Sequence, residues 1–322
     1  MRPQKFFMTL VLGIFACIGL AYGQDYPTKP VHLVVPYPPG GGTDLLARVV
    51  AKQLSEKWNK PVIIDNKGGA AGMIGGDAVA KAPPDGYTLV LSDPAPFVIV
   101  PHLYENMSYN PATAFAPVTV VARQSPVLVV GSHIPVNNIK ELLVYLKANP
   151  ETSFGSFGNG SYTHVAMEEF AKLSGTKLLH VPYKGTAPLI TDLVGGRLGL
   201  FLGTLGAVEQ HEKTGRLKIL AAATAERLPF KPDLPTVVES GVPGFSVNVW
   251  FGLAAPAGTP VDILNKIQRD MAAILKDKSF IDQSLTPQGL IPGGDSREAF
   301  TALMKSDTAR WGRLIKEYGI KP

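Results

Sequence analysis

The sequence predicts an α/β protein that folds into two lobes with a cleft between them. Apolar, strand-like runs alternate with helical patterns along most of the 322 residues, which is typical of an α/β fold. A plan of strand, glycine-rich turn and helix occurs early in the chain and again in its middle. The pattern also restarts after residue 124 and ends in two long helices, so we expect two chain crossings between the lobes, which form a hinge.

The first 23 residues have the layout of a secretory signal peptide. Arg2 and Lys5 precede an apolar stretch at residues 6–20, and a small-x-small pattern follows at residues 21–23. The apolar stretch is shorter than the roughly 20 residues of a membrane-spanning helix. We therefore expect cleavage near Gly23–Gln24 and a soluble periplasmic protein rather than an anchored one.

The cysteine content and the charge exclude several classes of protein. Cys17 is the only cysteine and lies in the leader, where bulky Phe15 and the continuing apolar run disfavour lipid attachment. Loss of the leader removes any disulfide or thiol nucleophile. The net charge of +5 is mild and unclustered, so we expect no nucleic-acid partner. We expect a monomer.

The first lobe is predicted from both ends of the chain, with a largely parallel sheet. A helix is expected over Asp44–Trp58 with Thr43 as its N-cap, and a glycine-rich segment at 68–82 leads into another helix. Strands are expected at 31–37, 60–66 and within 83–93, and the C-terminal helices at Val261–Asp277 and Ser296–Tyr318.

The second lobe is predicted from the middle of the chain. The crossings are expected near 117–124 and 246–254, which gives domains of 24–122 plus 250–322 and of 123–249. Its strands are expected at 125–132, within 152–161, and at 177–183, 198–204 and 217–224, and its helices at 139–150, 163–175 and 187–196.

Two glycine-rich turns, one in each lobe, are candidate anion sites. "PYPPGGGTD" at 36–44 and "SFGNGSYTH" at 156–164 each connect a strand to a helix. A helix N-terminus has unpaired N–H groups and a dipole that favours negative charge. Such turns are often glycine-rich for steric reasons, but one in each lobe could hold an anion from both sides. A third junction contains Lys184, Gly185, Thr186 and Ala187, where Lys184 is otherwise a solvated charge.

Enzyme motifs are absent from the sequence. It contains no phosphate-binding loop, dinucleotide fingerprint or G-x-S-x-G elbow, and its histidines lack paired metal spacing. The best candidates for catalysis are Asp44, Asp93 and His164. Asp44 is explained more simply as a helix start, and His164 with Glu168 as a surface contact on one helix. We therefore expect no cofactor, no metal and no catalysis, and we keep a periplasmic enzyme as the less favoured alternative.

Six blocks of the sequence resemble the periplasmic solute receptors of the tripartite tricarboxylate transporter family, the Bug-type receptors. The resemblance extends from about Tyr26 to the C-terminus. The blocks are residues 26–48, 75–91, 109–122, 157–175, 181–198 and 234–260.

The resemblance implies a bilobed type II periplasmic binding protein fold that closes over a small, usually carboxylated, ligand. It also implies membrane transporter subunits as partners, while a sensor that presents the closed form to a signalling partner stays an alternative. The residues that would hold carboxylate oxygens are Pro38, Gly40, Gly41 and Thr43 in the first loop, and Gly158, Asn159, Ser161 and Thr163 in the second.

Two departures from the family pattern concern the ligand. Ser92-Asp93-Pro94 replaces a small Gly-Thr stretch, and Leu202-Gly203 replaces a more polar pair. Asp93 would repel a second carboxylate and could pair with an ammonium or hydroxyl group, or it caps the following loop. A single carboxylate with an apolar or aromatic remainder therefore deserves as much weight as a tricarboxylate. The full predicted site is Tyr37, Pro38, Gly40, Gly41, Gly42, Thr43, Asp44, Ser92, Asp93, Gly158, Asn159, Ser161, Thr163, His164, Lys184, Gly185, Thr186, Ala187, Gly203 and Thr204.

Overall fold

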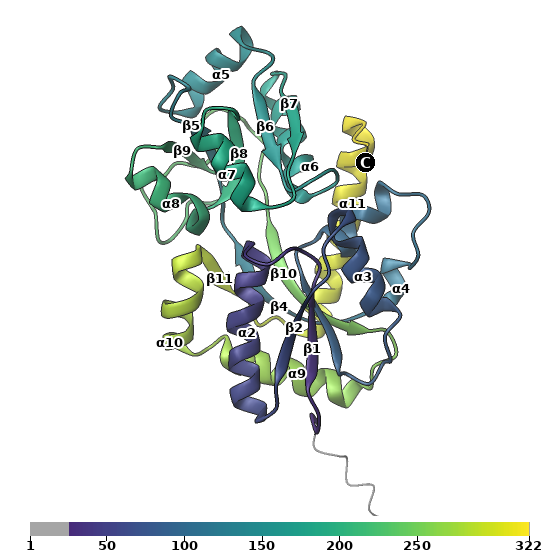
Figure 1. The fold of residues 1–322 in the computed structure, drawn as a ribbon. Coiled ribbons are helices and arrows are strands. Elements are labelled where there is room, and N and C mark those ends of the chain that lie inside the picture. Colours follow the sequence, from purple (N-terminus) through teal and green to yellow (C-terminus); the bar gives the residue numbers. More distant parts are fainter. Residues whose placement is uncertain (1–25, 322) are drawn as a thin grey trace, which may run out of the picture.

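The protein has two lobes, each built on one β-sheet with helices packed around it (Figure 1). The computed structural model describes residues 26–321, so the predicted leader lies outside the described residues. The first sheet has six strands in the order β11-β4-β10-β3-β1-β2, and the second has five in the order β7-β6-β8-β5-β9.

The first sheet and the helices around it combine segments from both ends of the chain. The N-terminal elements are β1 (Val31–Val35), α2 (Gly42–Trp58), β2 (Val62–Asn66), η3 (Ala70–Gly72), α3 (Met73–Ala80), β3 (Thr88–Ser92), η4 (Ala95–Ile99), η5 (Val100–His102), α4 (Pro111–Ala114) and β4 (Phe115–Gln124). The C-terminal elements are β10 (Val249–Pro256), α9 (Val261–Ile274), α10 (Lys278–Phe280), η6 (Ile281–Leu285), η7 (Thr286–Gln288), β11 (Leu290–Pro292) and α11 (Arg297–Tyr318).

The second lobe is one continuous segment. Its elements are β5 (Pro126–Gly131), α5 (Ile139–Ala148), β6 (Ser153–Ser156), α6 (Tyr162–Ser174), β7 (Leu179–Pro182), α7 (Thr186–Val194), β8 (Leu200–Thr204), α8 (Leu205–Lys213) and β9 (Leu217–Ala222). The chain enters this lobe at Ser125, between β4 and β5, and leaves it at Asn248, just before β10.

Both sheets are mixed, so the prediction of a largely parallel sheet was wrong. In the first sheet β1 is parallel to β2 and β3, whereas β10 is antiparallel to β3 and β4. In the second, β6 is parallel to β7 and β8, and β5 is antiparallel to β8 and β9. Every antiparallel pair involves β4, β5 or β10, the strands beside the crossings: β4 and β5 lead from the first lobe into the second, and β10 follows the return.

Helix α2 begins earlier than the sequence pattern indicated. Its N-cap is Gly41, with no hydrogen bond from a side chain, and its first residue is Gly42. The prediction of Thr43 as the N-cap was therefore wrong. Because Gly41 and Gly42 carry no side chain, the exposed N–H groups of this helix end are open to approach from the cleft.

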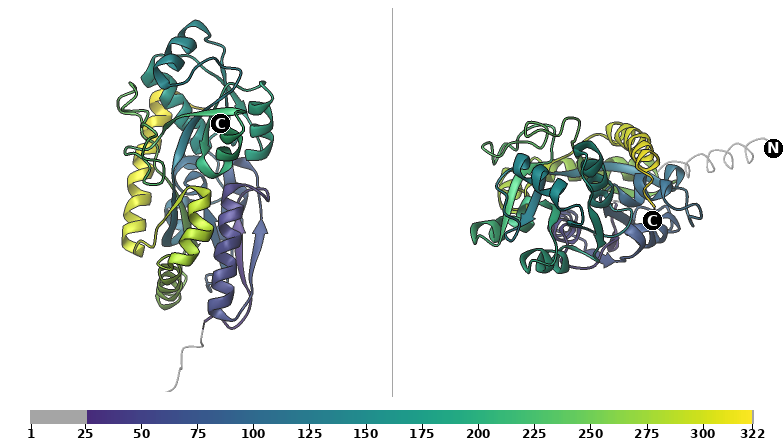
Figure 2. Two further views of the ribbon diagram at one scale, coloured as in Figure 1. Left: turned by 90° about the vertical axis from the view of Figure 1, so that its left-hand side faces the viewer. Right: turned by 90° about the horizontal axis from the view of Figure 1, so that it is seen from above.

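The C-terminal helix α11 connects the two lobes. Figure 2 shows it, in yellow, running along one side of the molecule from the first lobe to the second. The Arg310 guanidinium on α11 lies 3.3 Å from a carboxylate oxygen of Glu169 on α6 and donates to the carbonyl of Ser246. A continuous apolar cluster beneath it includes Trp311 and Phe170. Among the described residues, no helix is both long enough and apolar enough to cross a membrane.

Candidate functional site

A cavity of about 520 Å³ lies between the lobes, and both sheets contribute to its lining. From the first lobe come the loop before α2, the end of β3, the end of β4 and part of β10. From the second lobe come the turns that open α6, α7 and α8. The carboxyl ends of β1, β3, β4 and β8 all reach this cavity, the position at which α/β proteins commonly bind ligands.

The structure brings twelve of the predicted site residues together in this cavity. They are Tyr37, Pro38, Gly40, Gly41, Gly42, Thr43, Asp93, Lys184, Gly185, Thr186, Ala187 and Thr204. Eight others are not part of its lining: Asp44, Ser92, Gly158, Asn159, Ser161, Thr163, His164 and Gly203. The roles of all twenty residues in ligand contact stay predictions.

Helix N-termini from both lobes line the cavity. The N-terminal turn of α2 lines it from the first lobe and that of α7 from the second, where Gly185 is the N-cap. Within the described part of the chain, no hydrogen bond uses the N–H groups of Gly41, Gly42 or Thr43, nor those of residues 185–187. Unpartnered donors at the positive ends of two helix dipoles favour an anion between them.

The glycine-rich loop before α2 is held in shape by Asp44. Its carboxylate accepts from the N–H of Gly40 at 2.9 Å, from Arg48 at 2.9 and 3.0 Å and from Asn66 at 2.9 Å. Burial by itself would raise the pKa of Asp44, but these donors outweigh it and lower the pKa below its ordinary value. Gly40 has a φ of +87°, which favours glycine. Gly40 therefore shapes the loop, and its N–H is not free for a ligand.

The second glycine-rich loop uses most of its polar groups internally. The N–H of Gly158 donates to the Oγ of Ser156, and the N–H of Gly160 donates to the Nδ1 of His164. Ser161 caps α6 by accepting from the N–H of His164, and it also donates to the carbonyl of Gly158. This loop therefore reaches the cavity only through the residues on its two sides, Phe157 and Tyr162.

His164 is a buried residue and not part of a surface contact, so that interpretation of the sequence was wrong. Its ring stacks on that of His180 at 3.8 Å with 9° between the planes, and its Nε2 lies 3.9 Å from Glu168. His180 in turn is 2.6 Å from the Oγ of Ser156. Burial lowers the pKa of both imidazoles to about 4, and for His164 the neighbouring His180 adds to the shift. The pair is a neutral stack at physiological pH that supports the second loop.

Asp93 both faces the cavity and holds the chain that follows it. Its Oδ1 accepts from the hydroxyl of Tyr37 at 2.7 Å and from the N–H of Ala95 at 3.0 Å. Burial raises the pKa of Asp93 to about 6, although both hydrogen bonds oppose this shift. Lys184 lines the cavity from the other lobe with an exposed side chain.

Sequence reasoning missed most of the apolar part of the site. The predicted crossings could have indicated two of the lining residues, Gln124 at the end of β4 and Phe251 within β10. The other lining residues were not among the predicted site residues, although Pro39, Phe157 and Tyr162 lie within the two glycine-rich turns. These other residues are Pro39, Leu45, Phe157, Tyr162, Pro188, Gly206, Ala207, Gln288 and Leu290.

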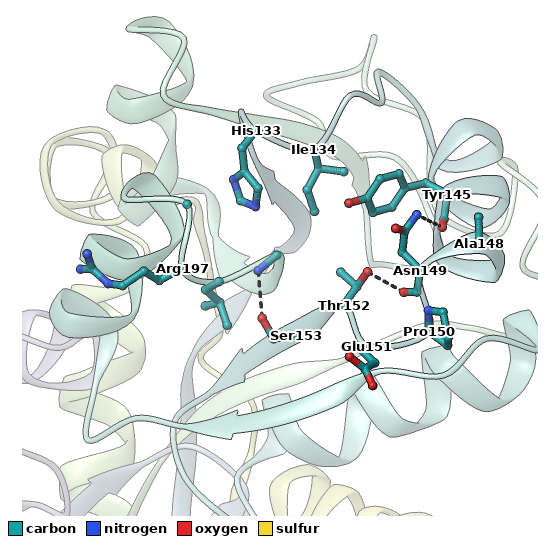
Figure 3. A pocket seen from close by; sticks show the side chains of 13 residues that line it. His133, Ile134, Tyr145, Ala148, Asn149, Pro150, Glu151, Thr152, Ser153 and Arg197 are labelled. Carbon is teal, nitrogen blue, oxygen red and sulfur yellow. Dashed lines mark hydrogen bonds between the residues drawn. The ribbon is translucent and has the colours of Figure 1, made fainter.

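A second hollow of about 520 Å³ lies in the second lobe (Figure 3), and it contains none of the predicted site residues. Its polar groups are largely satisfied by their own turns. Asn149 donates to the carbonyl of Tyr145, Thr152 donates to the carbonyl of Asn149, and the Oγ of Ser153 accepts from the N–H of Gly199. The interlobe cavity is therefore the better candidate for a ligand site.

The fold and the interlobe cavity define a solute-binding protein of the type II periplasmic kind. A family model described as "Tripartite tricarboxylate transporter family receptor" matches residues 46–320. Protein BugT of Bordetella pertussis is 33% identical over 317 residues, 97% of each chain, and a UPF0065 protein of Pseudomonas sp. strain P51 is 35% identical over 91% of this chain and 87% of its own. The chain belongs to the tripartite tricarboxylate transporter receptor family, whose members are periplasmic solute-binding receptors.

The solved structures that are similar to this one include the following three. "R. palustris Rpa4515 with adipate" has a TM-score of 0.88 and 38% identity, and covers 92% of this chain and 100% of its own. The periplasmic binding protein BugD has a TM-score of 0.84 and 36% identity, over 92% and 99%. "MatC (Rpa3494) from Rhodopseudomonas palustris with bound malate" has a TM-score of 0.83 and 27% identity, over 90% and 100%.

Proposed function

We propose that this receptor captures a small carboxylate-bearing ligand in the interlobe cavity and delivers it to a tripartite membrane transporter. The observation that carries the proposal is that the N-termini of α2 and α7, one from each lobe, line the cavity with unpartnered N–H groups. The family relationship supports it, since relatives of similar fold are described with adipate and with malate. An anion enclosed between lobes is stable only if such donors meet its charge.

Capture requires contact with both lobes, because a ligand that touched one lobe equally in the open and closed forms would shift no equilibrium. We place the hinge at Ser125 and Asn248, where the chain crosses between the sheets. These two residues lie close to the predicted domain boundaries, which divide the chain into 24–122 with 250–322 and 123–249. Closure about this hinge would bring the second glycine-rich loop toward the ligand carboxylate.

The rest of the ligand would meet a mostly apolar wall. Phe157, Phe251 and Leu45 line the cavity beyond the helix N-termini. An acid with one carboxylate and an apolar or aromatic remainder therefore fits as well as a di- or tricarboxylate. The receptor would act as a monomer in the periplasm after removal of residues 1–23, and it would return its ligand chemically unchanged.

A thermal-shift screen of residues 24–322 against mono-, di- and tricarboxylates, aromatic acids and amino acids tests this function. A ligand at 100 times its dissociation constant adds about 2.7 kcal/mol to the free energy of unfolding, which gives a clear rise in Tm. A bound carboxylate should also be recovered intact after denaturation, whereas an enzyme would convert it. A screen in which neutral or cationic solutes bind and no carboxylate does would refute the proposal.

A further inference from the structure

Asp93 presents one carboxylate oxygen to the ligand cavity. The Tyr37 hydroxyl and the Ala95 N–H both donate to Oδ1. Among the described residues, no hydrogen bond reaches Oδ2. The residue is only 4% exposed and lines the cavity. Oδ2 is therefore the hydrogen-bond acceptor that Asp93 offers to a bound molecule.

No basic side chain is among the described groups that contact this carboxylate. Tyr37 and Tyr162 are the titratable groups nearest to it, and burial raises the pKa of both phenols, so both stay neutral. Of the described residues that line the cavity, Lys184 is the only cation, and it is an exposed side chain on the opposite lobe. Asp93 thus has two neutral hydrogen-bond donors but lacks the positively charged partner that a buried carboxylate normally needs.

The lining of the cavity also contains a hydrogen-bond donor. The Tyr162 hydroxyl accepts from the Nε2 of Gln124 at 2.9 Å, which leaves its own proton available. Tyr162 and Asp93 both line the cavity. One acceptor and one donor in the same region match a ligand group that can both donate and accept, such as a hydroxyl.

We propose that Asp93 makes this receptor selective for carboxylates that also carry a hydrogen-bond donor, namely hydroxy- and amino-carboxylates. This inference rests on the proposed function, because it assumes that the helix N-termini hold the ligand carboxylate. A donor satisfies Oδ2, whereas an unsubstituted chain leaves Oδ2 desolvated without a partner. A second carboxylate of the ligand placed there would meet like charge.

Replacement of Asp93 by Asn inverts the polarity of this position. Oδ1 receives two donors, so the Asn side chain must place its amide oxygen there. Its NH2 group then occupies the position of Oδ2 and points into the cavity. Asp93→Asn therefore turns an acceptor into a donor with almost no change of shape.

The test is calorimetric titration of residues 24–322 with matched acids that differ by one hydroxyl. Malate and succinate form one pair, and mandelate and phenylacetate form the other. The wild-type protein should bind the hydroxyl-bearing acid of at least one pair about tenfold or more tightly, which corresponds to 1.4 kcal/mol. Asp93→Asn should reduce that preference, because the ligand hydroxyl exchanges a charged acceptor for a neutral amide donor. Asp65→Asn on β2, a carboxylate outside the cavity lining, is the matched control and should leave the preference unchanged.

Each outcome separates this inference from the proposed function. If no carboxylate binds the wild-type protein, the proposed function fails and the inference fails with it. If carboxylates bind but the wild-type protein prefers the acids without a hydroxyl, the inference alone is overturned, and this result needs no folded variant. If Asp93→Asn folds and lowers the affinity for both acids of a pair equally, Asp93 shapes the loop but does not recognise the ligand hydroxyl, and the inference is again overturned.

Discussion

The N–H of Gly40 donates to the carboxylate of Asp44 at 2.9 Å, so the loop before α2 is bonded to the first turn of that helix. The same carboxylate binds Arg48 and Asn66, and Asn66 also donates to the carbonyl of Tyr37. Asp44 is therefore a positioning residue. It accepts the N–H of Gly40 and so holds the loop in a shape that leaves the N–H groups of Gly41 and Gly42 available to a ligand.

Asp44→Ala should weaken carboxylate binding and lower the free energy of unfolding by about 1 kcal/mol, because it removes the acceptor of several partly buried hydrogen bonds. Because folding lowers the pKa of Asp44, its stabilisation is present above the ordinary pKa and is lost as the pH falls through the lower, folded value. Urea unfolding and titration calorimetry measure the two effects. Unchanged affinity in a destabilised variant would show that the loop keeps its shape without Asp44.

Gly41→Val should abolish carboxylate binding and leave the fold intact. The backbone of Gly41 has a φ of −80°, which any residue adopts, and a Cβ there would contact only the Pro38 carbonyl at 3.9 Å. The branched side chain would cover the N–H groups at the start of α2. Ala148→Val on the exposed face of α5 adds similar bulk away from the cavity and should bind normally. Normal binding by Gly41→Val would exclude the first loop from the site.

Lys184→Ala should reduce affinity for an anionic ligand several-fold and weaken its dependence on ionic strength. The ammonium group is exposed, so its attraction for the ligand is screened by salt. Calorimetry at low and high salt measures this effect, with Lys172→Ala on the exposed face of α6 as the control. An identical salt dependence in the wild-type protein and Lys184→Ala would show that the Lys184 ammonium does not attract the bound ligand.

Asp93→Asn should stabilise the ligand-free protein at neutral pH by about 1–3 kcal/mol, at 1.36 kcal/mol per pKa unit. Folding raises the pKa of Asp93 to about 6, so the folded state holds a proton that the unfolded state has lost. The ionised Asp93 carboxylate therefore destabilises the folded state increasingly as the pH rises from about 4 to about 6, and this destabilisation is complete above that range. Thermal unfolding of both proteins across this range is the measurement. Equal Tm values at neutral pH would contradict the prediction.

His180→Phe should make the protein less sensitive to acid. The pKa values of His164 and His180 are lowered to about 4, so the unfolded state binds protons that the folded state does not. The contribution of these neutral imidazoles to the free energy of unfolding is complete above about pH 6.5 and is lost progressively as the pH falls toward about 4. The variant keeps an aromatic ring in the stack and should lose less stability over this range, by about 1–3 kcal/mol. His133→Phe, at an exposed position, should behave like the wild-type protein.

Much of the secondary structure followed from local pattern. The predicted helix at 139–150 corresponds to α5, which ends two residues before Pro150, and the predicted strand at 217–224 corresponds to β9. Apolar periodicity and Gly/Pro punctuation act over a few residues, so a single sequence reveals them. Strand direction does not leave such a pattern, and for this reason the mixed character of both sheets was missed.

Only part of the site could be predicted in the same way. Strand-to-helix junctions mark helix N-termini, and the sequence indicated the glycine-rich turns before α2 and α6 and a third junction before α7. They do not show which donors remain free. Gly160 and His164 satisfy each other within the second loop, and the stack of His164 on His180 depends on the pairing of β6 with β7.

The sequence by itself determined the two-lobed α/β plan and the glycine-rich helix starts, because these depend on residues close together in the chain. Only the tertiary structure decided which N–H groups stay unpartnered and which oxygen of Asp93 faces the cavity. Tyr37 donates to Asp93 across 56 positions of sequence. Such a partner is set by the pairing of β1 with β3, and no local pattern encodes it.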